Sequence, residues 1–163
     1  MAQFTKGWDT LFKRSPYISL LLFVLIVAAV ALSGVQFLPG EWYLSLQKPF
    51  WTPPAWLFPP VWTVLYLMIA IAGWLIFSGS NRVLKVLWPL QLVLNGLWSW
   101  LFFGLHQMAL GLLDIVAMFA CIAVMVVISH KEARSVSRLL MPYLVWVGYA
   151  STLNLAIFML NPA

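Results

Sequence analysis

Five long apolar runs, separated by short polar or proline-rich stretches, dominate the hydropathy pattern of the chain. Each run holds about 20 residues, the length that an α-helix needs to cross the hydrocarbon core of a bilayer. We therefore predict five transmembrane helices, and the spans lie at about 16–38, 58–77, 84–105, 108–129 and 139–160. The predicted domain organisation is an N-terminal cytoplasmic segment, residues 1–15, followed by a five-helix transmembrane domain, residues 16–163.

The apolar runs are hydrophobic on all sides, and this pattern favours helices over a membrane-spanning barrel. Lipid-facing and lumen-facing positions alternate along a barrel strand. A helix satisfies its backbone polar groups within its own segment, as a lipid environment requires. The predicted fold class is an all-α membrane protein, a bundle of five transmembrane helices.

Composition agrees with a membrane location. Hydrophobic residues make up 64% of the 163 residues and charged residues only 8%. A soluble domain carries about 25% charged residues, so this chain is too apolar to cover a water-facing surface. Its single cysteine, Cys121, lies inside an apolar run and has no metal-ligand spacing around it. We predict that Cys121 serves packing and that the chain holds no metal.

Basic residues fall on one side of the five-span arrangement and predict its orientation. The cytoplasmic side of a membrane protein carries the excess of Lys and Arg. We therefore place the N-terminus in the cytoplasm and the C-terminus outside, and we expect no binding of nucleic acid because the basic residues are loop anchors. The residues on the basic side are Lys6, Lys13, Arg14, Arg82, Lys85, Lys131, Arg134 and Arg138; the other side holds only Lys48.

A tryptophan- and proline-rich segment, Glu41 to Trp62, joins the first two spans. Proline fixes φ and removes a hydrogen-bond donor, so the segment is predicted to be stiff and non-helical. Such a loop can cap a pocket in the bundle, and its candidate lid residues are Trp42, Trp51, Pro53 and Pro54. The alternative is an interfacial belt, because Trp and Tyr concentrate at membrane surfaces in general.

Three of the predicted helices carry aromatic and amide side chains on one face. These faces predict that rings and amides turn toward a shared interior, since amides at membrane depth face protein or water. The alternative is that the amides only hold helices together. The faces consist of Gln91, Asn95, Trp98 and Phe102 in the third span, Trp62, Tyr66, Ile69 and Gly73 in the second, and Trp146, Ala150, Leu153 and Asn154 in the fifth.

Asp114 is the acid that lies well inside a predicted span. An ionisable group within the membrane is a functional candidate, and a hydrated or hydrogen-bonded structural acid is the alternative. His106 and His130 fall in loops. The interior of the bundle therefore offers no histidine ligand for haem iron.

Four segments together resemble the translocator protein or tryptophan-rich sensory protein family, also called the peripheral benzodiazepine receptor family. They are Trp42-Tyr43, Lys48–Trp62, Gln91–Trp98 and Pro142–Trp146. The resemblance covers nearly the whole chain from the first span onward. It implies a homodimer of five-helix bundles that needs no cofactor. Beneath the first loop it implies a pocket for porphyrins, of the protoporphyrin IX or haem type, and for synthetic benzodiazepine-type ligands.

The pocket residues follow from the same resemblance, position by position. Those that match are Tyr43, Trp62, Asn95, Trp98, Trp146, Ala150 and Leu153. The implied function is a membrane receptor or sensor for tetrapyrroles. The alternatives are a porphyrin transporter and a light- and oxygen-dependent degradation of protoporphyrin. In that last case Trp62 and Trp146 match the tryptophans implicated in the chemistry, and whether the chain is an enzyme stays open.

The chain departs from the animal members of the family at the end of the fifth span. Those members carry a tyrosine followed by a basic residue there, as a sterol-recognition pattern. The stretch from Ala150 to Met159 has neither a tyrosine nor a basic residue. This difference argues against high-affinity sterol binding. The absence of a basic C-terminal tail points to a bacterial member in the cell membrane.

Overall fold

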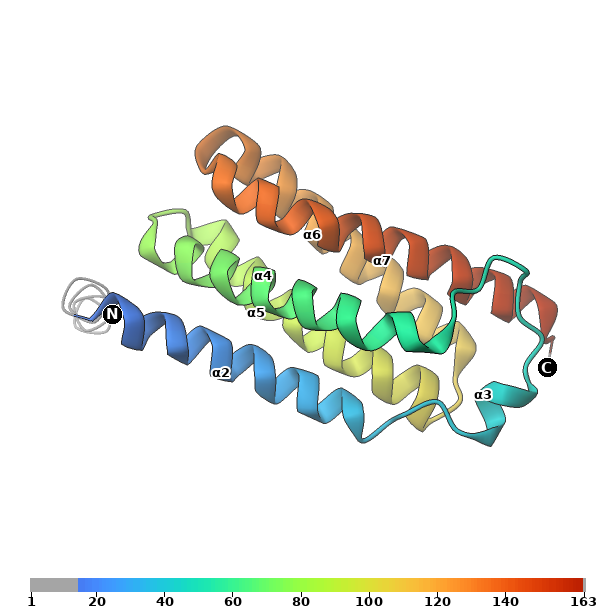
Figure 1. Ribbon diagram of the computed structural model, residues 1–163. Helices are drawn as coiled ribbons and strands as arrows, with labels where there is room; N and C mark the ends of the chain where they lie inside the picture. Colours follow the sequence, from blue (N-terminus) through green and yellow to red (C-terminus); the bar gives the residue numbers. More distant parts are fainter. Residues whose placement is uncertain (1–14, 163) are drawn as a thin grey trace.

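The computed structural model describes residues 15–162, so the predicted N-terminal segment and its basic residues Lys6, Lys13 and Arg14 lie outside the described residues. The described chain is all-α, and five of its helices are long and apolar enough to cross a membrane (Figure 1). They are α2 (Pro16–Val35), α4 (Phe58–Ser78), α5 (Arg82–Ser99), α6 (Met108–Glu132) and α7 (Arg134–Leu160). The predicted fold class and span count are confirmed.

Three short helical turns complete the described chain: α3 (Glu41–Ser45), η1 (Ala55–Leu57) and the π-helical turn η2 (Trp100–Gly104). The prediction that the first loop is entirely non-helical is therefore wrong at two places. The five residues of α3 contain no proline, and Glu41 lies in the first turn, where an acid interacts favourably with the helix dipole. The prolines between residues 49 and 54 occupy the non-helical part of the loop.

Several helix boundaries differ from the predicted spans, among them those of α2, α6 and α7. Helix α2 ends at Val35, and the next two residues, Gln36 and Phe37, form a turn that bonds back to Ser33 and Gly34. This end comes shortly before Pro39, which cannot continue a helix. At the other end of the chain, α7 already begins at Arg134. The polar stretch 130–138 contains no proline or glycine, so its good helix formers extend α6 and α7 beyond the apolar runs.

The five long helices pack in a ring in the order α2, α4, α7, α6, α5 and back to α2, and α4 and α5 also contact each other. The two described ends of the chain lie at opposite ends of the bundle (Figure 1). Helix α2 buries few of its residues, Ser19, Phe23 and Val27, whereas α6 and α7 each bury a whole face. The first loop, with α3, crosses the end of the bundle at which α7 finishes.

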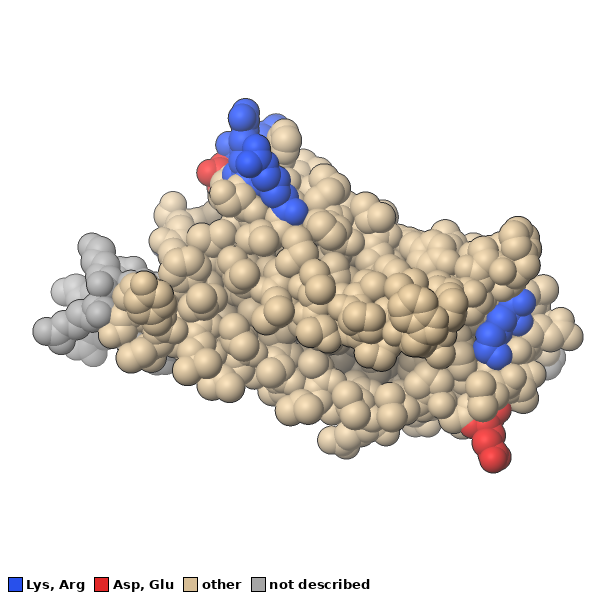
Figure 2. Space-filling view, in the orientation of Figure 1, with Lys and Arg blue, Asp and Glu red and all other residues tan. Residues whose placement is uncertain are grey.

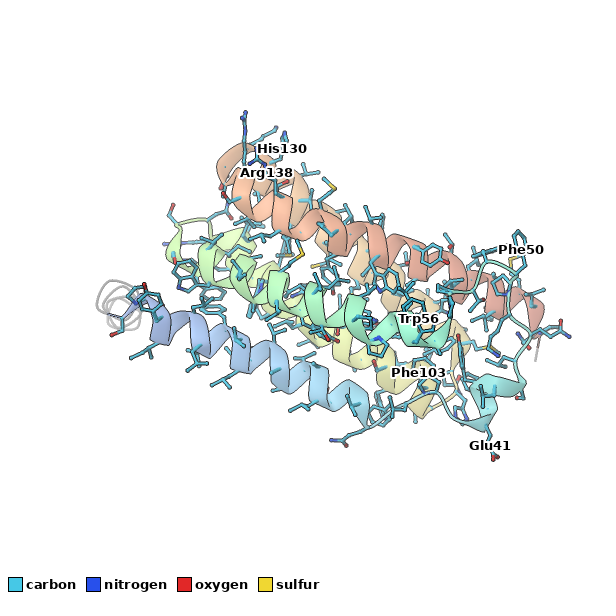
Figure 3. All side chains as sticks on the ribbon, viewed as in Figure 1. Glu41, Phe50, Trp56, Phe103, His130 and Arg138 are labelled. Carbon is cyan, nitrogen blue, oxygen red and sulfur yellow. The ribbon has the colours of Figure 1, made fainter. Side chains whose placement is uncertain are left out.

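On the face shown in Figure 2, the Lys, Arg, Asp and Glu side chains lie at the two ends of the described bundle. The turn before α5 and the break between α6 and α7 lie side by side, because Asn81 Nδ2 donates to Glu132 Oε2 at 2.6 Å. His130 and Arg138 lie at this end, and Glu41 and Phe50 lie at the other end, with the first loop (Figure 3). The described basic residues other than Lys48 therefore share one end of the molecule.

Helices α4 and α5 approach each other closely at Gly73. A Cβ atom on Gly73 would lie 2.2 Å from Cε2 of Trp88. The Trp88 indole is buried, and its Nε1 donates to the backbone carbonyl of Ile69 at 3.0 Å. Gly73 therefore leaves the space that the Trp88 ring fills.

Candidate functional site

Aromatic residues line the contact between α4 and α7 near the first loop. Phe58, Trp62 and Tyr66 occupy successive turns of α4. The Trp62 ring lies 5.2 Å from the Tyr66 ring and 6.3 Å from the Tyr143 ring, measured between centroids. The Phe58 ring meets the Trp146 ring edge-on at 5.7 Å. These edge and tilted arrangements are the ones that aromatic pairs prefer.

A chain of buried hydrogen bonds connects α4, α5 and α7 beside these rings. Tyr66 Oη donates to Asn95 Oδ1 at 2.9 Å, and Asn95 Nδ2 donates to Tyr143 Oη at 3.2 Å. Tyr143 Oη in turn donates to Gln91 Oε1 at 3.0 Å. Asn95, Gln91 and Tyr143 are almost completely buried. The amides predicted to face the interior do so, and through these bonds they hold three helices together.

Trp98 extends the cluster on α5 and is fixed from two sides. Its Nε1 donates to Asn154 Oδ1 on α7 at 3.0 Å. Its ring stacks on Phe102 at 5.4 Å and an angle of 10°. Asn154 also donates to the carbonyl of Met108 at 3.3 Å. Asn154 therefore links α5, α6 and α7, which favours its structural interpretation.

Three buried polar atoms have no hydrogen-bond partner among the described residues: Gln91 Nε2, Asp114 Oδ2 and Trp146 Nε1. Buried polar groups in proteins are nearly always paired. The Trp146 N–H is thus a donor available to a bound molecule or to water. The Asp114 residue is 8% exposed, and its Oδ2 accepts no hydrogen bond from a described residue. A structural acid is expected to accept such a bond, so this atom does not support the structural interpretation.

The first loop is attached to the end of α7 by two sets of hydrogen bonds. Tyr149 Oη donates to the carbonyl of Trp51 at 2.6 Å. Asn161 Oδ1 accepts from the Gln47 N–H at 2.9 Å, and Asn161 Nδ2 donates to the Gln47 carbonyl at 3.0 Å. The Tyr149 ring also lies 5.9 Å from Trp146. These contacts hold the proline-rich loop over the α7 side of the aromatic cluster.

The α3 turn of the loop packs against the connection between α5 and α6. Trp42 stacks on His106 at 4.2 Å and 14°, and Tyr43 meets Phe103 edge-on at 5.3 Å. Lys48 Nζ lies 4.7 Å above the Tyr43 ring. Burial raises the pKa of the Tyr43 phenol above its usual value. His106 adopts a left-handed backbone conformation, with φ of 56°.

The structure brings most of the predicted site residues to one end of the bundle, but in separate groups. Trp62, Asn95 and Trp146 belong to the cluster between α4, α5 and α7, with Trp98 beside it. Ala150 packs against the core and Leu153 is buried on α7. Tyr43 and Trp42 lie over the end of α5, whereas Trp51 lies over α7 and is followed by Pro53 and Pro54.

Sequence reasoning did not single out four residues that the structure places in or beside the cluster. Tyr143 is the one that the sequence could have indicated most easily, because it shares a helical face with Trp146 and Ala150 at spacings of three and seven residues. Phe58 and Tyr149 depend on how α4 and α7 are rotated against each other. His106 depends on the fold of the α5–α6 connection. The four residues are Phe58, His106, Tyr143 and Tyr149.

Fold and site together define an integral multi-pass membrane protein with an aromatic, amide-bearing end covered by a tryptophan-rich loop. Residues 18–160 match the model of the TspO/MBR family, and the chain belongs to this family. It is 43% identical over 145 residues to the tryptophan-rich protein TspO of Archaeoglobus fulgidus, covering 85% of this chain and 94% of the relative.

Two further relatives extend the similarity to proteins named for sensing and translocation. The tryptophan-rich sensory protein of Cereibacter sphaeroides is 34% identical over 143 residues, covering 86% of this chain and 90% of the relative. The human translocator protein is 33% identical over 152 residues, covering 88% of this chain and 90% of the relative. The resemblance seen in the four sequence segments is thereby confirmed.

Proposed function

We propose that this protein is a membrane receptor or sensor that binds porphyrins and related flat hydrophobic ligands beneath its first loop. The observation that carries the proposal is the half-buried Trp146, whose N–H has no partner among the described residues and whose ring lies in the aromatic cluster. A flat macrocycle gains stacking energy against indole rings. A carboxylate or carbonyl oxygen on the edge of the macrocycle can accept a hydrogen bond from the Trp146 N–H.

The proposed ligand contacts come from three helices and the loop. Trp62, Trp98 and Trp146 supply the rings, and Asn95 lies between Tyr66 and Tyr143 at the base of the cluster. Ala150 provides room on α7, and Leu153 and Tyr43 supply apolar surface. In the described structure each of these three rings contacts other aromatic side chains, such as Tyr66, Phe102 and Phe58, so the ligand replaces some of those contacts with contacts to itself.

Orientation and assembly are part of the same proposal. The basic end of the bundle faces the cytoplasm of a bacterial cell, because Lys and Arg are enriched on that side. The first loop and the aromatic cluster then lie on the outer side. The protein acts as a homodimer and also takes synthetic benzodiazepine-type ligands, and it takes sterols poorly.

Degradation of protoporphyrin is a second candidate, which the oxidisable indoles of Trp62 and Trp146 in the aromatic cluster favour. The described residues hold no group of histidine, cysteine or acidic side chains that could bind a metal. A photo-excited porphyrin transfers energy to oxygen, and the reactive oxygen attacks the macrocycle or a neighbouring indole. Porphyrin transport is a further alternative and requires a second access state.

We expect protoporphyrin IX, incubated with the purified protein in air, to be consumed in light and to persist in darkness. Chromatography and mass spectrometry of the pigment measure the outcome, and illuminated protoporphyrin in empty micelles is the control. Product formed in darkness by the wild type and lost in Trp146→Phe would contradict light-driven side chemistry and establish an enzyme.

A further inference from the structure

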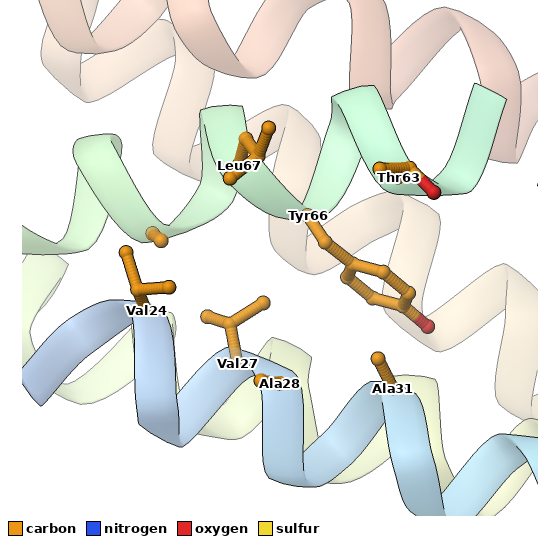
Figure 4. Close-up of a pocket in the computed structure, with 8 residues that line it drawn as sticks. Val24, Val27, Ala28, Ala31, Thr63, Tyr66 and Leu67 are labelled. Carbon is orange, nitrogen blue, oxygen red and sulfur yellow. The ribbon is translucent and has the colours of Figure 1, made fainter. Parts of the chain in front are cut away.

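A groove on the side of the bundle, between α2 and α4, lies beside the aromatic cluster and shares Tyr66 with it (Figure 4). Its volume is about 190 Å³. Small residues open it: Ala28 and Ala31 on α2 and Ala70 on α4. Both helices span the membrane, so the groove lies at the depth of the lipid chains.

The lining of the groove is almost entirely hydrocarbon in character. It contains no charged residue, and its polar side chains are Thr63 and Tyr66. Both hydroxyl groups already donate hydrogen bonds within the protein. Thr63 Oγ1 donates to the carbonyl of Pro59 at 2.8 Å, and Tyr66 Oη donates to Asn95. The groove therefore offers no free donor and no counter-ion to a polar head.

Size and shape restrict the occupant further. Sites for drug-sized ligands have volumes of about 300–1,000 Å³, so this groove is too small for a flat macrocycle. It follows α2 from Val24 to Ala31, a rise of about 10 Å at 1.5 Å per residue. An apolar groove of this volume and about 10 Å in length fits a segment of a single hydrocarbon chain.

The position of the groove indicates from which surface of the membrane an acyl chain enters it. Ala31 lies in the last turns of α2 and Thr63 in the second turn of α4, so both lie at the end that the first loop connects. Val24 and Ala70 lie deeper in the bundle. A lipid whose head group stays at the loop-side surface can lay its chain from Thr63 toward Ala70.

We propose that the groove between α2 and α4 is a binding site for one acyl chain of a phospholipid from the leaflet on the side of the first loop. A free fatty acid fits less well, because no cation lines the groove to pair with its carboxylate. Tyr66 forms part of the wall and also contacts Trp62 and Asn95. The bound chain therefore touches the same side chain that braces the aromatic cluster.

The experiment uses the full-length protein in bilayer vesicles that contain a phosphatidylcholine with a photoreactive diazirine on one acyl chain. After illumination, mass spectrometry maps the labelled residues. We expect labelling of the groove to exceed, several-fold, labelling of the exposed face of α6 around Leu113, Val116 and Val124, which meets the same lipids. Equal labelling of the two surfaces would overturn the proposal.

Two variants that fill the groove test the same point, and each serves if the other fails to fold. Ala28→Leu and Ala31→Leu are expected to lower groove labelling several-fold. Ala29→Leu is the matched control, because Ala29 is exposed on α2 outside the groove, and it should leave labelling unchanged. Labelling that persists in the filled variants would overturn the proposal. The outcome does not depend on porphyrin binding.

Discussion

Replacement of Trp62 and Trp146 together by leucine is expected to weaken protoporphyrin IX binding by roughly 5- to 150-fold. Each stacked aromatic pair contributes about 0.5–1.5 kcal/mol beyond its buried area, and each 1.4 kcal/mol is a tenfold change in Kd. The Trp146 change also removes the N–H that has no partner in the described protein. Quenching of porphyrin fluorescence in a titration of the purified protein measures the effect.

The matched control for this variant replaces two tryptophans that lie away from the cluster. Trp56 is 71% exposed and Trp100 is 42% exposed. The double variant Trp56→Leu with Trp100→Leu removes the same number of indoles and should bind protoporphyrin with nearly the wild-type Kd. An unchanged Kd in the Trp62 and Trp146 variant, or an equal loss in both double variants, would contradict a specific aromatic site.

The Gly73→Ala variant is expected to lose about 1–3 kcal/mol of stability, the usual cost of overpacking a core. The new Cβ atom would meet the Trp88 ring at 2.2 Å. The ring cannot yield without weakening its bond to the Ile69 carbonyl and its edge contact with Phe23. Thermal unfolding in detergent, followed by circular dichroism, measures the loss.

Gly96→Ala is the matched control for Gly73→Ala. Gly96 also lies within a membrane-spanning helix, but the nearest side-chain atoms to its added Cβ are Ser33 Oγ at 3.8 Å and Val30 Cγ1 at 3.9 Å. These are ordinary contact distances. Because alanine is the better helix former, this variant should unfold at the wild-type temperature or slightly above it. Equal losses in the two variants would show that the Trp88 contact is not the cause.

The sequence was sufficient for those features of the fold that depend on one helix at a time. Hydropathy gave the five spans, and helical spacing identified the shared face of Gln91 and Asn95 on α5 and Phe102 in η2, which the structure buries. The grouping of basic residues followed from the span count. Orientation in the membrane stays a prediction, because the bundle itself does not show which end faces the cytoplasm.

Features that depend on two or more helices could not be read from the sequence. The spacing along α7 does not reveal that Tyr143 lies between Asn95 and Gln91, because this depends on the rotation of α7 against α5. The stack of Trp42 on His106 depends on the path of the first loop. The groove beside Ala28 likewise arises from small residues on two helices whose pairing the sequence does not state.

The most direct test of the central claim is a structure of the protein in a lipid bilayer with protoporphyrin IX bound. We predict that the macrocycle lies beneath the first loop, in contact with Trp62 and Trp98, with one of its oxygen atoms accepting the Trp146 N–H. A macrocycle bound elsewhere on the bundle, touching none of these three tryptophans, would contradict the claim.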